Sequence, residues 1–294
     1  MFIRKHCERQ YLDLIKNIIK NGTVEKTRNG VTRTLLGQSM RFDLTNNKMP
    51  LLTTKKMAWK TCLRELLWFV NGKTSNDILK EQNVKIWNDN ASRDFLNSRN
   101  LFHLKEGDLG PVYGHQWRHF NAKYTNCDED YTGQGVDQLQ NVIDMLKDPK
   151  ERKSRRIIMS AWNPLQLDEM ALPPCHILCQ FHVMGEDELS CSLYQRSGDV
   201  GLGIPFNIAS YSFLTHLLAV HCQLKPKEFI HHIGNAHIYE DHARPLLKQT
   251  KNWPKPFPQL FVEPRRDNIN SYSFDDFLLE NYVSHPNIKM DMVV

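Results

Sequence analysis

Residues 171–199, ALPPCHILCQFHVMGEDELSCSLYQRSGD, decide the fold class of this chain. Two β-type runs at 177–183 and 189–195 flank Met184-Gly-Glu-Asp-Glu188, and this spacing predicts a hairpin. The following loop leads into an apolar helix at about 206–222, a strand at 229–233 and a helix from about 237. Because strands and helices mix without regular βαβ alternation, we expect an α+β fold.

The segments before this stretch add helices with different apolar faces. Apolar residues recur at helical spacing over 8–21 and 135–147, and 156–161 is strand-like. Residues 59–71 are apolar on nearly every side, so Glu65 within them needs polar partners. No flexible linker divides the chain, and we expect a single domain over 1–294.

Composition indicates a globular protein with a sizeable core. Apolar residues make up 40% of the 294 residues, and the formal net charge is +5. The seven cysteines are scattered without paired CxxC spacing, which is typical of reduced thiols. Neither a secretory signal nor an 18-residue apolar run is visible, so we expect a cytoplasmic protein, with nuclear entry left open.

Cys175 is one candidate nucleophile, because the prolines before it fix an extended approach to a strand. A small core cysteine remains the alternative interpretation. Arg155-Arg156 and Arg196-Ser-Gly-Asp199 are candidate anion clamps, although each arginine could equally be a solvated surface charge. The histidines and cysteines lack the spacing of a zinc site, so we expect no metal.

Six segments in order resemble the thymidylate synthase family. They are Glu65-Leu-Leu-Trp-Phe69, Lys85-Ile-Trp-Asn-Asp-Asn90, Gly107-Asp-Leu-Gly-Pro-Val-Tyr-Gly114, Ala171-Leu-Pro-Pro-Cys-His176, Tyr194-Gln-Arg-Ser-Gly-Asp199 and Gly203-Ile-Pro-Phe-Asn-Ile-Ala-Ser-Tyr211. The similarity runs from about residue 8 to 294. Residues 101–108 and 121–133 look like insertions of the eukaryotic-type enzymes, and we expect the monofunctional form.

The resemblance implies reductive methylation of dUMP to dTMP, with 5,10-methylenetetrahydrofolate as co-substrate and dihydrofolate as product. The implied fold is a mixed β-sheet flanked by helices, with the sheet forming the back-to-back interface of a homodimer. The implied partners are dUMP, a reduced folate and a second copy of the chain, without a membrane or a required nucleic acid.

The resemblance also assigns roles to residues. The implied catalytic group is Cys175, which attacks uracil C6, with Glu65, Tyr113, Asn207 and Arg196. Implied substrate ligands are Arg28, Arg155, Arg156, His176, Arg196, Ser197, Asp199, Asn207, His237 and Tyr239, with Arg155 and Arg156 reaching the neighbouring subunit's site. Implied folate contacts are Lys55, Ile86, Trp87, Asn90, Asp199, Gly203, Phe206 and Val293, the last in a C-terminal segment that closes over the folate.

Two residues depart from the family pattern, and three other functions remain open. Asn235 replaces the usual aspartate beside His237, and Arg33 adds a second arginine near Arg28. A deoxycytidylate hydroxymethylase of the same fold is the nearest alternative, and Asn207 argues against it because its amide matches uracil O4 and N3–H. A basic RNA-binding protein and a thiol hydrolase are the others, and no recognisable motif supports either.

Overall fold

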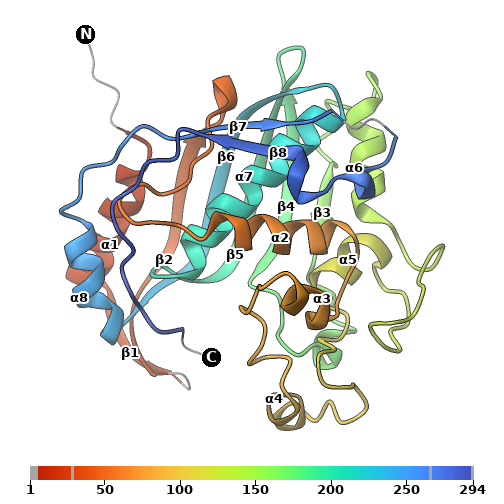
Figure 1. Ribbon diagram of the computed structural model, residues 1–294, viewed down its shortest axis with the longest axis horizontal. Helices are drawn as coiled ribbons and strands as arrows, with labels where there is room; N and C mark the ends of the chain where they lie inside the picture. Colours follow the sequence, from red (N-terminus) through yellow and green to blue (C-terminus); the bar gives the residue numbers. More distant parts are fainter. Residues whose placement is uncertain (1–5, 28–29, 265–266, 293–294) are drawn as a thin grey trace.

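The helix α7 (Gly203–His221) lies at the centre of the molecule and is buried on almost every side. The computed structural model describes residues 6–27, 30–264 and 267–292. In Figure 1, α7 crosses one face of the large sheet and runs beside α2 (Trp59–Val70), and it packs on β5, β6 and α2. An apolar helix without a polar face is stable only when other elements cover most of it, as they do here.

The large sheet has six strands in the order β1-β2-β6-β5-β4-β3. Their bounds are Thr23–Thr27 (β1), Gly30–Asp43 (β2), Lys225–Tyr239 (β6), Glu188–Asp199 (β5), His176–Met184 (β4) and Ile158–Ser160 (β3). Neighbouring strands are antiparallel except β5 and β6, which are parallel and connected through α7. This mixed sheet with flanking helices confirms the predicted α+β class.

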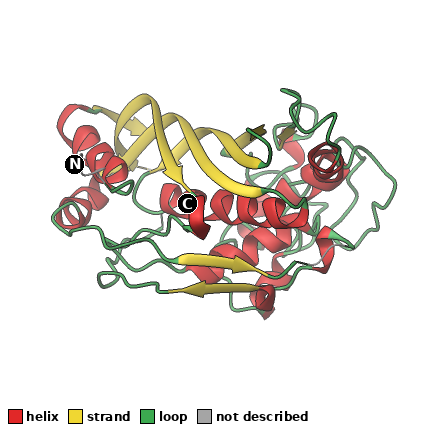
Figure 2. Ribbon diagram, turned by 90° about the horizontal axis from the view of Figure 1, so that it is seen from above, coloured by secondary structure: helices red, strands yellow, loops and turns green. Residues whose placement is uncertain are grey.

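The elements form layers, which Figure 2 shows from above. The large sheet is one layer, the helices lie under it, and the two-stranded ribbon of β7 (Gln259–Val262) and β8 (Phe277–Glu280) lies on the far side of the helices. The opposite face of the sheet carries Leu178, Tyr194 and His232 at paired positions, and Tyr194 is 44% exposed.

The remaining helices are α1 (Arg9–Asn21), α3 (Asn76–Glu81), α4 (Arg93–Ser98), α5 (Tyr113–His119), α6 (Gln138–Lys147) and α8 (Glu240–Gln249). The predicted helices at 8–21, 59–71, 135–147 and 206–222 and the predicted hairpin are confirmed within a few residues. The helix predicted from about His237 is also present, but it begins three residues later, at Glu240. Residues 237–239 extend β6, because they still pair with β2 on one side, and α8 begins at Glu240.

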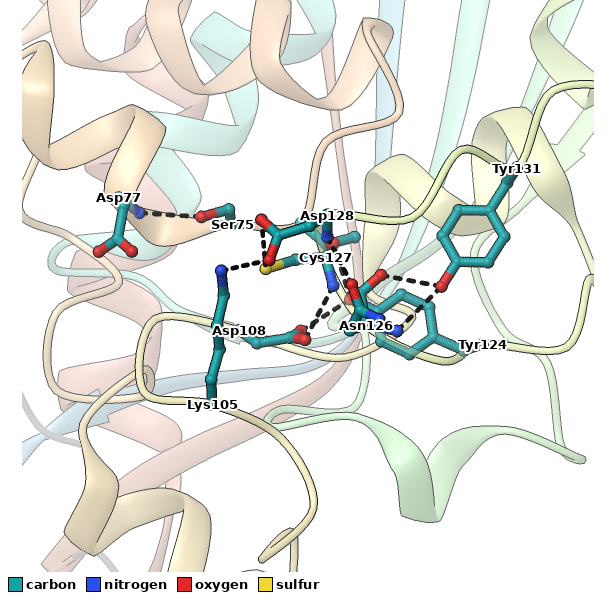
Figure 3. A network of polar contacts seen from close by, with 10 residues as sticks. Ser75, Asp77, Lys105, Asp108, Tyr124, Asn126, Cys127, Asp128 and Tyr131 are labelled. Atoms are coloured by element: carbon teal, nitrogen blue, oxygen red, sulfur yellow. Dashed lines mark hydrogen bonds and ion pairs between the residues drawn. The ribbon is translucent and has the colours of Figure 1, made fainter.

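A buried carboxylate joins the two segments that resemble insertions, as Figure 3 shows. Asp108 is fully buried and accepts hydrogen bonds from the Gly110 N–H (2.8 Å), the Tyr124 hydroxyl (2.7 Å) and the Cys127 N–H (2.9 Å). A buried carboxylate needs such donors to be stable. Because residue 110 lies just before α5, this network also positions the start of α5, where Tyr113 lies.

No helix in the described ranges is both long and apolar enough to span a membrane. Among these same residues, no three His, Cys, Asp or Glu side chains gather as a metal site.

Candidate active site

One cavity of about 1010 Å³ brings together most of the site residues expected from the sequence. Its walls come from the β1–β2 hairpin, the helices α2, α4 and α5, the ends of β5 and β6, and the start of α7. The expected residues that line it are Glu65, Ile86, Trp87, Asn90, Tyr113, Cys175, His176, Arg196, Ser197, Asp199, Gly203, Asn207, His237 and Tyr239.

Arg196 lies against the segment that carries Cys175. Its Nε donates to the Pro174 carbonyl (2.8 Å) and its Nη2 to the Pro173 carbonyl (3.1 Å). The same Nη2 is 3.8 Å from the Cys175 sulfur, and the Arg196 N–H donates to the Cys175 carbonyl at 2.8 Å. The guanidinium is therefore held in one orientation beside the sulfur, where its charge favours a thiolate.

Burial and the arginine act in opposite directions on Cys175. Burial raises the pKa of the Cys175 thiol, and the Arg196 charge offsets only part of this effect. The thiol of the free protein is therefore protonated at neutral pH. A nucleophile at this position needs a proton acceptor when a substrate binds.

Glu65 lies on α2 and faces the cavity. Its Oε1 accepts a 2.7 Å hydrogen bond from the Trp87 indole. Burial raises the pKa of the Glu65 carboxyl to about 7, and the indole hydrogen bond opposes this effect only partly. A carboxyl with a pKa near neutrality can both give and take a proton, which is the requirement for general acid–base catalysis.

Tyr113 connects α5 to the Cys175 segment. Its hydroxyl accepts a 2.8 Å hydrogen bond from the Cys175 N–H, and its ring stacks on His176 with centroids 4.0 Å apart. The His176 Nδ1 in turn lies 2.8 Å from the Tyr211 hydroxyl of α7. Burial lowers the pKa of His176 to about 3, so this imidazole is neutral and orients its neighbours without adding a charge.

Asn207 projects from the first turns of α7 into the cavity. In the described part of the chain, no group hydrogen bonds to its side-chain amide. Its donor and its acceptor are therefore both available to a ligand that presents a matching pair.

The loop before α7 is fixed by Asp199 and Lys55. Asp199 accepts hydrogen bonds from the N–H groups of Gly201 (2.8 Å) and Leu202 (3.1 Å), and the Lys55 ammonium donates to the Gly201 carbonyl at 2.6 Å. Burial lowers the pKa of Lys55 to about 8, although the Asp199 charge raises it. Lys55 thus lies behind this loop and outside the cavity lining.

Three other expected residues lie outside the cavity lining, and two fall outside the described residues. Phe206 is half-buried on α7, and Arg155 and Arg156 are exposed beside β3. Arg28 and Val293 lie outside the described residues.

The two residues that depart from the family pattern have partners. The Asn235 Oδ1 lies 3.1 Å from the His237 Nδ1, so the amide keeps a contact that the usual carboxylate could make. Burial lowers the pKa of His237, and the Asp199 charge opposes this effect. Arg33 forms an ion pair with Glu240 at 3.1 Å.

Several cavity residues carry no sequence signal that identifies them. They are Glu25, Thr32 and Thr34 from the β1–β2 hairpin, Phe95 and Ser98 from α4, Arg99 directly after α4, and Met292 near the C-terminus. Only the tertiary fold brings these polar and apolar side chains to one space.

A thiol beside an arginine, with a carboxyl of near-neutral pKa in the same cavity, is typical of enzymes that form a covalent bond to their substrate. The family model described as thymidylate synthase matches residues 9–294. This chain belongs to the thymidylate synthase family.

The relatives include proteins of two lengths. The human thymidylate synthase is 52% identical over 98% of this chain and 91% of its own length, and that of equine herpesvirus 2 is 50% identical over 98% and 99%. The maize bifunctional dihydrofolate reductase-thymidylate synthase is 51% identical over the whole chain and 56% of its own length. The chain thus spans about half the length of the bifunctional plant relatives.

Proposed function

We propose that the protein is a thymidylate synthase, which converts dUMP to dTMP and 5,10-methylenetetrahydrofolate to dihydrofolate, and that residues 1–294 form one catalytic domain. The observation that carries this proposal is the Cys175 sulfur, 3.8 Å from the Arg196 guanidinium in a cavity shared with Glu65, Tyr113 and Asn207. The family membership of nearly the whole chain supports it.

In the proposed mechanism, the Cys175 sulfur forms a bond to C6 of the uracil ring, and the electron pair of the C5–C6 double bond moves toward O4. The Arg196 charge beside the sulfur favours the attacking thiolate. The free amide of Asn207 donates to O4 and accepts from N3–H, which orients the ring and selects uracil over cytosine.

The proton transfers fall to groups on the helices α2 and α5. Glu65 exchanges protons through water near O4, since its pKa of about 7 allows both directions. The Tyr113 hydroxyl lies beside Cys175 and assists removal of the C5 proton. When bound, the folate would supply both the one-carbon unit and the electrons that reduce it. The S–C6 bond then breaks, the C5–C6 double bond re-forms, and Cys175 leaves as a thiolate beside Arg196.

Polar and aromatic side chains divide the cavity between the two ligands. Ser197, His237 and Tyr239, together with Arg28 and Arg196, hold the phosphate and ribose of dUMP. His176 keeps the nucleophile segment in place. Ile86, Trp87, Asn90, Asp199 and Gly203, which line the cavity, would hold the folate. We also assign folate contacts to Phe206 and Lys55, which lie outside the cavity lining, and to Val293, which lies outside the described residues.

We also propose a homodimer in which Arg155 and Arg156 reach the phosphate site of the partner. Two observations support this: both arginines are exposed and outside their own cavity, and no helix of the described residues covers the sheet face to which Leu178, Tyr194 and His232 belong. Two such faces packed back to back would bury these side chains. The proposed location is the cytoplasm, and no nucleic acid is required.

The decisive experiment is a spectrophotometric assay of the purified protein with 5,10-methylenetetrahydrofolate and either dUMP or dCMP. We expect dihydrofolate absorbance to rise with dUMP alone. Turnover of dCMP without that rise would instead assign a hydroxymethylase.

A matched pair of cysteine variants tests the nucleophile. Cys175→Ser should abolish turnover and leave the oligomeric state unchanged. Cys127→Ser, which removes a half-buried thiol outside the cavity, should keep normal turnover. Near-normal turnover by Cys175→Ser would contradict the proposed mechanism.

A further inference from the structure

His242 on α8 makes contacts in two directions that the proposed mechanism does not use. Its side chain is almost fully buried, and its Nε2 lies 2.8 Å from the Asp291 carbonyl near the C-terminus. Its Nδ1 lies 3.9 Å from the Asp199 Oδ1. Among the described residues, this buried Nδ1 has no hydrogen-bond partner, so Asp199 is the group toward which it is directed.

Asp199 is the point at which a contact with His242 can affect the cavity. Its carboxylate already holds the N–H groups of Gly201 and Leu202 at the start of α7, and it lines the cavity itself. Any group that fixes the Asp199 carboxylate therefore also fixes the loop that presents Asn207.

The C-terminal segment, residues 287–292, packs against the loop at residues 199–202. Met292 lines the cavity, and Met290 packs against the core. A Cβ placed on Gly201 would lie 2.9 Å from the His242 Nδ1 and 3.4 Å from the Met290 sulfur. A side chain at residue 201 would therefore clash with the imidazole, so the loop, His242 and Met290 lie close together.

We propose that His242 is a positioning residue that fastens the C-terminal segment to Asp199 and so holds the cavity wall formed by Met292. This proposal depends on the proposed function in one respect only, namely that the wall formed by Met292 belongs to the folate site. The imidazole acts by donating from Nε2 to the Asp291 carbonyl, while its Nδ1 faces the Asp199 carboxylate at 3.9 Å as a charge contact, which requires its protonated form.

The charges around the imidazole agree with this role. Asp199 raises the pKa of His242 and outweighs the opposing effect of burial, while the Asp291 carbonyl and Asp241 add smaller contributions in the same direction. The Tyr239 ring packs edge-on at 5.7 Å and brings no charge.

Hydrogen exchange tests the contact without any use of activity. We expect His242→Ala to speed amide exchange of residues 287–292 by about tenfold, because the segment loses its side-chain anchor. His216→Ala is the matched control, since His216 is equally buried and its Nε2 also binds one backbone carbonyl, that of Lys48, at 2.9 Å. Equal exchange in the two variants would overturn the proposal.

Kinetics then test whether His242 acts through the segment. We expect His242→Ala to raise the KM for the folate about fivefold or more, with the KM for dUMP changed less than about twofold. In a chain that ends at Lys289, the same substitution should have no further effect on the folate KM. A further rise there would show that His242 acts by another route and would overturn the proposal.

His242→Gln, which keeps an N–H donor group but carries no charge, should fall between His242→Ala and the unsubstituted protein in both measurements. A glutamine no better than alanine would contradict the role of the donor. If the unsubstituted protein shows no turnover, the proposed function fails, and the exchange measurement still decides the role of His242.

Discussion

Glu65→Gln should increase the stability of the folded protein at alkaline pH while removing its activity. Burial raises the pKa of this carboxyl from 4.5 to about 7 in the folded protein. The folded state therefore binds the proton more tightly than the unfolded chain, and its stability falls as the pH rises from the lower value through the higher one. A glutamine has no charge to bury, and its oxygen can still accept from the Trp87 indole.

The two pKa values give the size of the effect. They differ by about 2.5 (about 7 minus 4.5), so an ionised Glu65 lowers the free energy of unfolding by about 3 kcal/mol well above pH 7. At about pH 5.5 most folded molecules already carry the proton, and the expected advantage of the glutamine falls to about 1 kcal/mol.

Urea unfolding at about pH 8.5 and about pH 5.5 measures this difference, with turnover followed in parallel. The matched control is Glu25→Gln, which neutralises an exposed carboxyl at the same cavity. The reasoning is refuted if Glu65→Gln is no more stable than the unsubstituted protein at the higher pH. It is also refuted if the gain is the same at both pH values.

Three further substitutions test separate parts of the structure. Glu8→Ala removes the buried acceptor of the N–H and hydroxyl donors of residues 53–54. It should lower the free energy of unfolding by about 3–5 kcal/mol in urea titrations, and a loss below about 1 kcal/mol would contradict this. Gly110→Ala should lower Tm by several degrees in calorimetry, since its φ is +73° and a Cβ would lie 2.1 Å from the Glu169 carbonyl; an unchanged Tm would show that this turn can move. Arg196→Lys should reduce kcat/KM for dUMP at least about tenfold, because a lysine cannot hold two carbonyls and the sulfur together; near-normal kinetics would argue against the clamp.

Much of the fold could be predicted because its main elements carry local signals. The apolar run of α7 and the hairpin of β4 and β5 are examples, since burial on all sides and turn residues are both visible in sequence. The β1–β2 hairpin could not be predicted in this way. All of β1 is exposed, so it has no apolar alternation, and β2 finds its second partner, β6, about two hundred residues later in the chain.

Site residues could likewise be predicted where the local sequence carries a signal, and not elsewhere. Cys175 directly precedes β4 and Arg196 lies on the adjacent strand β5, so a predicted hairpin already suggests that they lie close together. Arg99 at the end of α4 and Glu25 on β1 reach the cavity from segments without a chemical motif. Local sequence also says nothing of how Lys55 is used, since its contact with the Gly201 carbonyl depends on packing between distant segments.

The pairing of β6 with β5 and with β2 joins segments that are far apart in the chain, and this affects the order in which the molecule folds. The walls of the cavity come from segments between residues 25 and 292, so the Cys175 thiol acquires its surroundings only after the most distant pairings have formed. Such pairings close long loops and form slowly. During refolding, the Cys175 thiol should therefore become protected from a thiol reagent at the rate at which the whole molecule folds, not at the faster rate at which the β4–β5 hairpin forms.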